Sequence, residues 1–300
     1  MKRISVTDIV AAKNRRKLVM LTAYDYSTAR ILDECGIDIV LAGDSYAMVG
    51  QGHSTTLPAT MEGMLMITSS VSRACRRSLV VADMPFLSYQ TDLKNARMNA
   101  GMFLKQADAD AVKVENSWNV RDMIKAIVDI DIPVMGHIGL TPQSVKRMGG
   151  YRVQGKKLDS ALSLIEQAGE LEQLGVFAIV LEAVPSELAA MITKSVSIPT
   201  IGIGAGPGCD GQVLVINDLL GTDKDFLPRH AKKYADLHGV IGSAVARFKK
   251  DVINGGFPGG KQSFKMDPAL LKELKKTLPR GKNEDRQKSG KTPENSINIL

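Results

Sequence analysis

The sequence predicts one α/β domain in which eight strands and their connecting helices close into a barrel, the (β/α)8 or TIM-barrel fold. Along the 300 residues, short runs rich in β-branched residues alternate with longer amphipathic stretches, which is typical of repeated βα units. Most of the short runs are apolar almost throughout, as strands covered by helices on both faces must be. The barrel is expected over residues 1–265, and residues 266–300 are expected to form a Lys-rich, disordered C-terminal tail.

The expected strands and helices follow one another in barrel order. Strands are expected at residues 18–24, 37–43, 78–84, 109–114, 132–137, 177–181, 198–203 and 212–217. Helices are expected at residues 91–106, 118–130, 160–174 and 186–195, where apolar residues recur at helical spacing. Residues 229–254 would supply the helical region that closes the barrel, and residues 266–278 would form one further short helix.

Two connections depart from this regular order. The gap between Ile203 and Gln212 is shorter than the roughly twelve residues that a parallel crossover needs. Either one of these two strands is misplaced, or the last barrel unit is irregular. Residues 139–158 are polar and rich in glycine and follow a strand, so they are expected to form a long loop of the kind that covers an active site.

Composition excludes several other classes of protein. Residues 266–300 contribute +3 of the net charge of +7, and the rest is spread thinly without a basic run between aromatics, so no nucleic-acid partner is expected. No apolar run approaches the roughly 20 residues of a membrane span, and the basic N-terminus lacks a secretory apolar stretch. A cytoplasmic location is therefore expected. Cys35, Cys75 and Cys209 are too scattered for a metal site or a disulfide framework.

Charged and polar residues recur where the apolar strands end. In an α/β barrel the reactive groups sit at the C-terminal ends of the strands. A single acid at such a position could equally cap a helix or lie on the surface, but a set of them would be desolvated unless they faced a pocket, a metal or one another. Their carboxylate oxygens suit Mg²⁺ or another divalent ion. The residues are Asp44, Ser45, Asp83, Lys113, Glu115 and Glu182, with His137 as a possible pocket residue.

Other motifs give weaker evidence of a binding or catalytic site. The glycine-rich run at residues 202–208 resembles a phosphate-binding loop, but Pro207 removes a backbone donor and no clear helix follows. A tight turn that lets the backbone approach a ligand is the better interpretation. His53, His230 and His238 show no metal-ligand pairing, and the chain contains neither a nucleophile elbow nor a P-loop.

Eight motifs in order resemble those of the ketopantoate hydroxymethyltransferase family, over about residues 4–264. They are GDS at 43–45, QGHSTTLP at 51–58, ADMPF at 82–86, KVE at 113–115, GHIGLTPQ at 136–143, GGYRVQGK at 149–156, LEAVP at 181–185 and IGIGAG at 201–206. The resemblance implies a Mg²⁺-dependent barrel related to phosphoenolpyruvate mutase and isocitrate lyase. It also implies a large homo-oligomer, often a decamer.

The implied reaction transfers a hydroxymethyl group from 5,10-methylenetetrahydrofolate to 3-methyl-2-oxobutanoate, giving ketopantoate in the first step of pantothenate synthesis. By position, the resemblance places the metal ligands on Asp44, Asp83 and Glu115, and the substrate site on Asp44, Ser45, Asp83 and Lys113. It places the catalytic base on Glu182, which would remove the C3 proton of the oxo acid while Mg²⁺ stabilises the developing enolate.

Two features depart from the family pattern. Asn116 and Ser117 stand where a glycine pair is expected, next to the metal-site glutamate, and the tail after Phe264 is longer than usual. The folate contacts are unassigned, although the loop at residues 139–156 is suggested to lie near them.

Alternative functions stay open at this point. Another metal-dependent aldolase or lyase of the same superfamily would act on a different 2-oxo acid. A class I aldolase would use Lys113 as a Schiff-base nucleophile. A lyase of the isocitrate lyase group would need a nucleophilic cysteine, for which Cys209 is the nearby candidate. A non-catalytic interaction protein, using the basic tail, would have no reason to place acids at so many strand ends.

Overall fold

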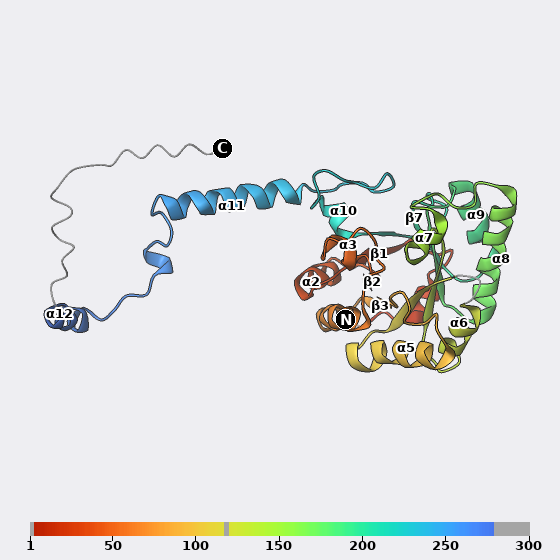
Figure 1. The fold of residues 1–300 in the computed structure, drawn as a ribbon, viewed down its shortest axis with the longest axis horizontal. Coiled ribbons are helices and arrows are strands. Elements are labelled where there is room, and N and C mark those ends of the chain that lie inside the picture. Colours follow the sequence, from red (N-terminus) through yellow and green to blue (C-terminus); the bar gives the residue numbers. More distant parts are fainter. Residues whose placement is uncertain (1–2, 117–119, 279–300) are drawn as a thin grey trace. The chain divides into compact units, whose positions relative to one another are not determined.

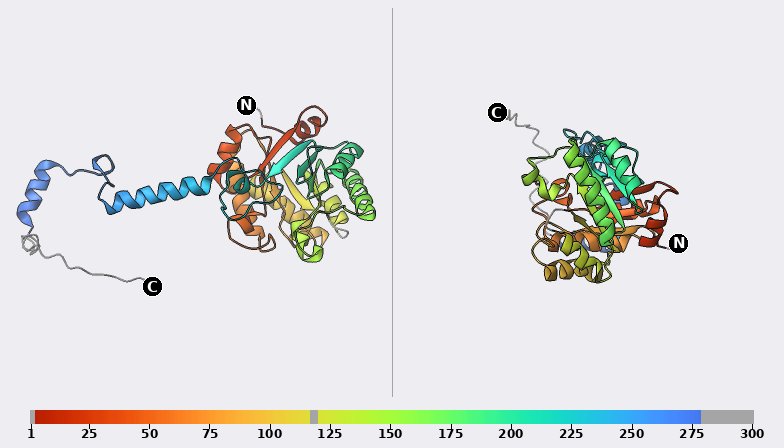
Figure 2. Two further views of the ribbon diagram at one scale, coloured as in Figure 1. Left: turned by 90° about the horizontal axis from the view of Figure 1, so that it is seen from above. Right: turned by 90° about the vertical axis from the view of Figure 1, so that its right-hand side faces the viewer.

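The computed structural model describes residues 3–116 and 120–278 of the chain (Figure 1). The chain divides into two compact units, Met1–Gly239 and Val240–Leu300. The first unit is a closed barrel whose strands follow one another in sequence order from β1 to β8. All neighbouring strands are parallel, and β1 pairs with β8 to close the ring, as the red and cyan arrows show in Figure 2. The predicted (β/α)8 barrel is confirmed.

Each predicted strand is present. The strands are β1 Leu18–Thr22, β2 Ile39–Ala42, β3 Leu79–Asp83, β4 Ala111–Glu115, β5 Val134–Gly139, β6 Ala178–Glu182, β7 Thr200–Ile203 and β8 Gly211–Leu214. They are short, and almost every position in β2 to β7 is buried, which is why their sequences are nearly continuous apolar runs.

Helices follow the first six strands and cover the outside of the barrel (Figure 1). The long ones are α2 Tyr26–Glu34, α4 Met61–Ala74, α5 Leu93–Ala107, α6 Arg121–Val128, α8 Leu158–Leu174 and α9 Ser186–Ser195. Asp25, Thr60 and Asp92 cap the first turns of α2, α4 and α5 with their side-chain oxygens. The predicted start of α6 at residue 118 lies outside the described residues.

Shorter helices complete the first unit. They are α1 Val6–Ala11, α3 Tyr46–Val49, the 3-10 turn η1 Pro142–Ser144, α7 Val145–Met148 and α10 Ile216–Leu220. The predicted long loop at residues 139–158 therefore contains η1 and α7, and only residues 140–141 and 149–157 of it belong to no helix or strand.

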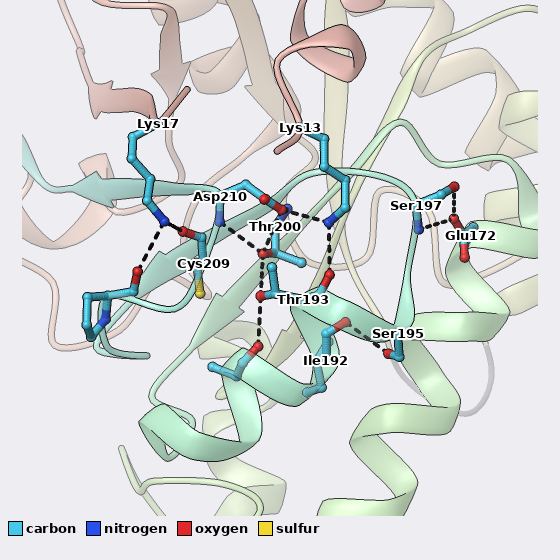
Figure 3. Close-up of polar contacts among 12 residues, drawn as sticks. Lys13, Lys17, Glu172, Ile192, Thr193, Ser195, Ser197, Thr200, Cys209 and Asp210 are labelled. Carbon is cyan, nitrogen blue, oxygen red and sulfur yellow. Dashed lines mark hydrogen bonds and ion pairs between the residues drawn. The ribbon is translucent and has the colours of Figure 1, made fainter. Parts of the chain in front are cut away.

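The connection between β7 and β8 contains no helix, and residues 204–210 join the two strands directly. Both strands were predicted correctly, so the irregular unit is real. Figure 3 shows what replaces the missing helix. Lys13 Nζ lies 2.8 Å from Asp210 Oδ2, and it also donates to Thr193 O at 2.9 Å. The same Asp210 oxygen accepts the Thr200 backbone N–H at 2.9 Å. Lys17 donates to the carbonyl of Cys209, so the segment before β1 holds the loop before β8.

Helix α11 Leu237–Ile253 starts just before the boundary between the units, and most of it belongs to the second unit. The second unit also contains η2 Gly260–Gln262 and α12 Pro268–Thr277. Helix α12 confirms the short helix predicted at residues 266–278. The prediction of a helix from residue 229 is wrong at its start, because residues 229–236 form no helix and Tyr234 N donates instead to Leu219 O at 2.8 Å. The first compact unit ends at Gly239 rather than near residue 265. The predicted domain boundary after residue 265 stays a prediction. Among the residues described, no helix combines the length and hydropathy that a membrane span requires.

Candidate active site

The residues at the strand ends point into the barrel because of their position in each strand. Leu79 and Val81 of β3 belong to the cluster that fills the barrel interior. Side chains alternate along a strand, so Asp83, two residues further on, points to the same side. The same alternation brings the remaining charged side chains together at the C-terminal end of the barrel: Lys113 and Glu115 on β4, His137 on β5, and Glu182 on β6.

An ion pair lies at the centre of this site. Lys113 Nζ is 2.6 Å from Asp83 Oδ1, and both side chains are almost fully buried. The second Asp83 oxygen accepts the backbone N–H of Asp44 at 3.2 Å. Burial alone would lower the pKa of Lys113, but the charges of Asp83, Glu115 and Asp44 raise it above its ordinary value. Lys113 is therefore a fixed ammonium group, which disfavours the class I aldolase, because a Schiff base requires the free amine.

Negative charge exceeds positive charge in the site. Burial, followed by the charge of Asp83, raises the pKa of Asp44 to about 7. Burial and then the charge of Asp44 raise the pKa of Glu115 well above its ordinary range. The ammonium of Lys113 interacts with three carboxylates, those of Asp44, Asp83 and Glu115. A bound cation would relieve the repulsion among these carboxylates.

Gln143 links two of these acids, a role that was not predicted from the sequence. Its side-chain amide donates to Asp44 Oδ2 and to Met84 O, both at 2.9 Å. Its backbone N–H donates to Glu115 Oε2 at 3.0 Å, and its Oε1 accepts from the Tyr89 hydroxyl at 3.0 Å. The turn η1 thus holds the orientation of Asp44 and Glu115.

His137 lies between the ion pair and Glu182. Its Nδ1 is 3.4 Å from Lys113 Nζ, and its Nε2 is 3.3 Å from Glu182 Oε2. Burial, reinforced by the charge of Lys113, lowers the pKa of His137 well below its ordinary value, so the ring is neutral. An ammonium group can only donate, so Nδ1 is the acceptor and Nε2 carries the proton. Nε2 makes no hydrogen bond within the described part of the chain.

Glu182 is the least buried acid of the site, with a side chain that is 17% exposed. Burial raises its pKa to about 7, and the charges of Lys113 and His230 oppose that rise. A carboxylate with this pKa can accept a proton near neutral pH, as a general base must. Ser45, the remaining predicted residue, lies beside the site with its Oγ 2.8 Å from the Tyr24 hydroxyl.

The donor atoms fit a hard cation. Within residues 3–116 and 120–278, no three His, Cys, Asp or Glu side chains are already arranged as a complete metal site. Mg²⁺, however, keeps several waters and commonly uses one or two carboxylates together with substrate oxygens. Asp44 and Glu115 are carboxylates with raised pKa values and no cationic partner closer than the shared Lys113. The assignment of Asp44, Asp83 and Glu115 as metal ligands stays a prediction.

The comparison with known families identifies the chain's relatives. The model of the ketopantoate hydroxymethyltransferase family matches residues 3–260. The chain belongs to this family. A 3-methyl-2-oxobutanoate hydroxymethyltransferase of Dehalococcoides mccartyi is 54% identical to it over 266 residues, which cover 89% of this chain and 94% of that protein. The predicted resemblance is confirmed, and family membership makes the protein an enzyme.

Solved structures with low sequence identity share the fold. A phosphonopyruvate hydrolase in complex with oxalate and Mg²⁺ has a TM-score of 0.57 at 11% identity, covering 92% of this chain and 96% of that one. The 2,3-dimethylmalate lyase, a member of the phosphoenolpyruvate mutase and isocitrate lyase superfamily, has a TM-score of 0.54 at 16% identity, covering 94% and 96%. The predicted barrel type is therefore confirmed.

The site of this family member opens into a cavity of about 1060 Å³. Its wall includes residues that sequence reasoning missed, notably Asp218 on α10 and His230 in the segment after it. His230 packs against Gly204 at the end of β7. Residue 230 was predicted to lie in a helix. No local sequence pattern indicates that residues 221–230 return to the mouth of the barrel.

Cys209 and the later glycines of the glycine-rich run, Gly206 and Gly208, do not line this site. Cys209 is buried just before β8, at the N-terminal end of the strands, so it offers no nucleophile to the cavity. The two glycines approach helix α9. A side chain at position 206 would come within 2.4 Å of Ser186 Cβ, and one at 208 within 2.8 Å of Ala190 Cβ. Close packing against α9 requires these two glycines, and the predicted ligand turn stays a prediction.

Asn116 departs from the family pattern without entering the site. It follows Glu115, which faces the interior, so its own side chain points outward. Its Nδ2 donates to Gln167 Oε1 on α8 at 3.3 Å, and its backbone N–H donates to His137 O at 2.8 Å. Ser117, the second departure, lies outside the described residues.

Proposed function

We propose that this protein transfers a hydroxymethyl group from 5,10-methylenetetrahydrofolate to 3-methyl-2-oxobutanoate, forming ketopantoate in pantothenate synthesis. The observation that carries the proposal is the pairing, in one cavity, of a base with a pKa of about 7, Glu182, and the acid cluster around Lys113. The names of the curated relatives support the choice of substrate.

The acid cluster is where the oxo acid would bind. Asp44, Asp83 and Glu115 would hold Mg²⁺, which when bound supplies Lewis-acid polarisation of the 2-oxo group. A phosphonopyruvate hydrolase of the same fold has been determined with oxalate and Mg²⁺, which supports the choice of a divalent ion. The ammonium of Lys113 provides a fixed positive charge for the oxygens of the oxo acid, and the Ser45 hydroxyl provides a hydrogen-bond donor.

Proton transfer would use Glu182. Its carboxylate removes the C3 proton of the oxo acid, and the charge left on the oxo group is balanced by Lys113. His137 Nε2 lies 3.3 Å from Glu182 Oε2, so the neutral imidazole is an immediate neighbour of the proposed base. The carbon that has lost its proton then forms a bond to the one-carbon unit of the folate, and a water molecule supplies the hydroxyl group of the product. Both carbon–nitrogen bonds of that unit break, and tetrahydrofolate leaves with the C3 proton and one proton of the water on its two nitrogens.

The proposal extends to assembly and location. A cytoplasmic homo-oligomer, a decamer by family resemblance, is supported by large apolar side chains that the outer barrel helices expose. These include Ile31, Met66, Met98, Leu162 and Met191, each more than half exposed. Cys35, Cys75 and Cys209 are free thiols, which suits a reducing compartment.

Deuterium exchange at C3 of 3-methyl-2-oxobutanoate, followed by NMR without folate, tests the proposed reaction. Exchange that requires Mg²⁺ and stops with EDTA is expected. Exchange that survives EDTA, with borohydride trapping on Lys113, would point to a Schiff base instead. Exchange without ketopantoate formation after addition of 5,10-methylenetetrahydrofolate would indicate another aldolase or lyase of the superfamily.

A further inference from the structure

The cavity has two chemically different halves. The acids follow or end β2, β3, β4 and β6, so the oxo-acid half of the proposed function occupies that arc of the barrel. The remaining arc, β7, β8 and β1, ends in Ile203, Leu214 and Thr22, and Val215 follows β8. The strand ends of this second half are therefore mainly apolar, and its charged groups, such as Asp218 and Asp223, come from the segment after β8.

The cavity is also larger than a small oxo acid requires. Its volume of about 1060 Å³ is enough for a ligand of drug size. A five-carbon oxo acid bound at the acid cluster around Lys113 would leave the other half of the cavity free for the second reactant. The shape of the cavity thus places the one-carbon donor over β7, β8 and β1.

Asp218 is a carboxylate of this half that has no partner in the described part of the chain. It lies on α10, directly after β8, and it is half-buried in the cavity wall. Its carboxylate makes no hydrogen bond or ion pair with any residue in the described part of the chain. Burial, followed by the charge of Asp223, raises its pKa. A partly buried carboxylate without a donor is costly unless a ligand supplies one.

The backbone around Asp218 is fixed. Gly221 N donates to Asp218 O at 3.3 Å, and the Ile216 N–H donates to Thr22 Oγ1 of β1 at 3.0 Å. The neighbouring Asn217 uses its amide on Thr222 Oγ1 at 3.2 Å. Asp218 is thus a preorganised acceptor on a short helix tied to the barrel.

We propose that Asp218 binds the pyrimidine edge of the folate pteridine ring, where the 2-amino group and N3–H present two parallel N–H donors. This inference rests on the proposed function. A carboxylate accepts two such donors in a bidentate pair, as it does from the guanidinium of arginine. The apolar walls at Ile203, Leu214 and Val215 would cover the faces of the ring. The one-carbon unit sits on the opposite side of the ring from this edge, so a ring held at Asp218 would direct that unit away from Asp218 and into the cavity that Glu182 also lines.

The substitution Asp218→Asn tests the assignment. It keeps the shape but replaces one acceptor oxygen by a donor, so the KM for 5,10-methylenetetrahydrofolate should rise roughly 10- to 100-fold. The KM for the oxo acid should change far less. Asp236→Asn is the matched control, because Asp236 is an exposed acid of the same segment outside the cavity, and its KM values should equal those of the wild type. An unchanged folate KM in Asp218→Asn overturns the inference.

A second measurement uses the unmodified protein, in case the variant misfolds. Calorimetry with tetrahydrofolate and with its analogue lacking the 2-amino group should show weaker binding of the analogue by the same factor. In Asp218→Asn the two ligands should bind alike, because the contact is already lost. Equal binding by the wild type would contradict the inference. Metal-dependent C3 exchange without folate is measured alongside, and its absence would count against the proposed function rather than against Asp218.

Discussion

Single residues of the site owe their chemistry to neighbours that are distant in sequence. Glu182 and His137 are separated in sequence by η1, α7 and α8, yet their side chains lie 3.3 Å apart. Burial, reinforced by the charge of Lys113, lowers the pKa of His137 and keeps it neutral, and burial brings the pKa of Glu182 to about 7. The strand-end position of each residue could be predicted from the sequence, but its protonation state depends on the assembled site.

Replacing Glu182 by Gln should abolish the first chemical step while leaving binding intact. The amide cannot accept the C3 proton, so exchange should fall by roughly 10²–10⁴-fold. NMR exchange measures the loss, and calorimetry of Mg²⁺ and oxo-acid binding is the control. Exchange at the wild-type rate would show that another group is the base.

Exchange should also depend on pH through Glu182. A base acts in its deprotonated form, so the rate should rise as the pH increases through about 7 and then level off. The charged or titratable groups that interact with Glu182 are Lys113, His137, His230, Asp44, Glu115 and Tyr151. Since the charge of His230 lowers the pKa of Glu182, His230→Ala should move the midpoint to higher pH. A profile that falls over this range would contradict the role of Glu182 as base.

Among the elements, the β7–β8 unit shows how a barrel closes without its usual crossover helix. The sequence left open whether a strand was misplaced, because length alone cannot distinguish a short loop from a wrong strand. The buried pair Lys13–Asp210 makes the short loop possible, since Asp210 accepts from Lys13 and Thr200 at once (Figure 3). Lys13 lies more than 190 positions away from Asp210 in sequence, so no local pattern links the two residues.

Substituting Lys13 by Met should destabilise the barrel. Both side chains of the pair are 8% exposed, and removal of one partner leaves a buried carboxylate uncompensated, at a cost of about 3–5 kcal/mol. Arg30→Met, which breaks the exposed Arg30–Glu34 pair, should cost less than about 0.5 kcal/mol. Denaturant unfolding measures both. Equal small effects would mean that the pair does not hold the loop.

The whole molecule is expected to respond to the ion that its acids would hold. A ligand at 100 times its Kd stabilises the folded state by about 2.7 kcal/mol, or roughly 5–10 °C in Tm for a domain of this size. Saturating Mg²⁺ with the oxo acid should produce this shift in thermal unfolding. Asp44→Asn should lose the shift, and without metal it should be at least as stable as the wild type, because it removes a charge from a crowded site. A full shift in this variant would exclude Asp44 as a ligand.

The sequence by itself determined the barrel, its strands and the residues that face its interior. Strand alternation has a period of two, so a carboxylate at a strand end is placed on the inner or outer face by local sequence alone. Asp83, Glu115 and Glu182 could be found in this way.

Only the tertiary structure decided which connecting segments return to the site and how the last unit closes. Gln143, Asp218 and His230 lie in or beside loops, whose paths depend on contacts with distant strands rather than on a repeating pattern. The protonation of the site was likewise set only when Lys113, His137 and the acids met in one buried volume, because burial and neighbouring charges shift a pKa jointly.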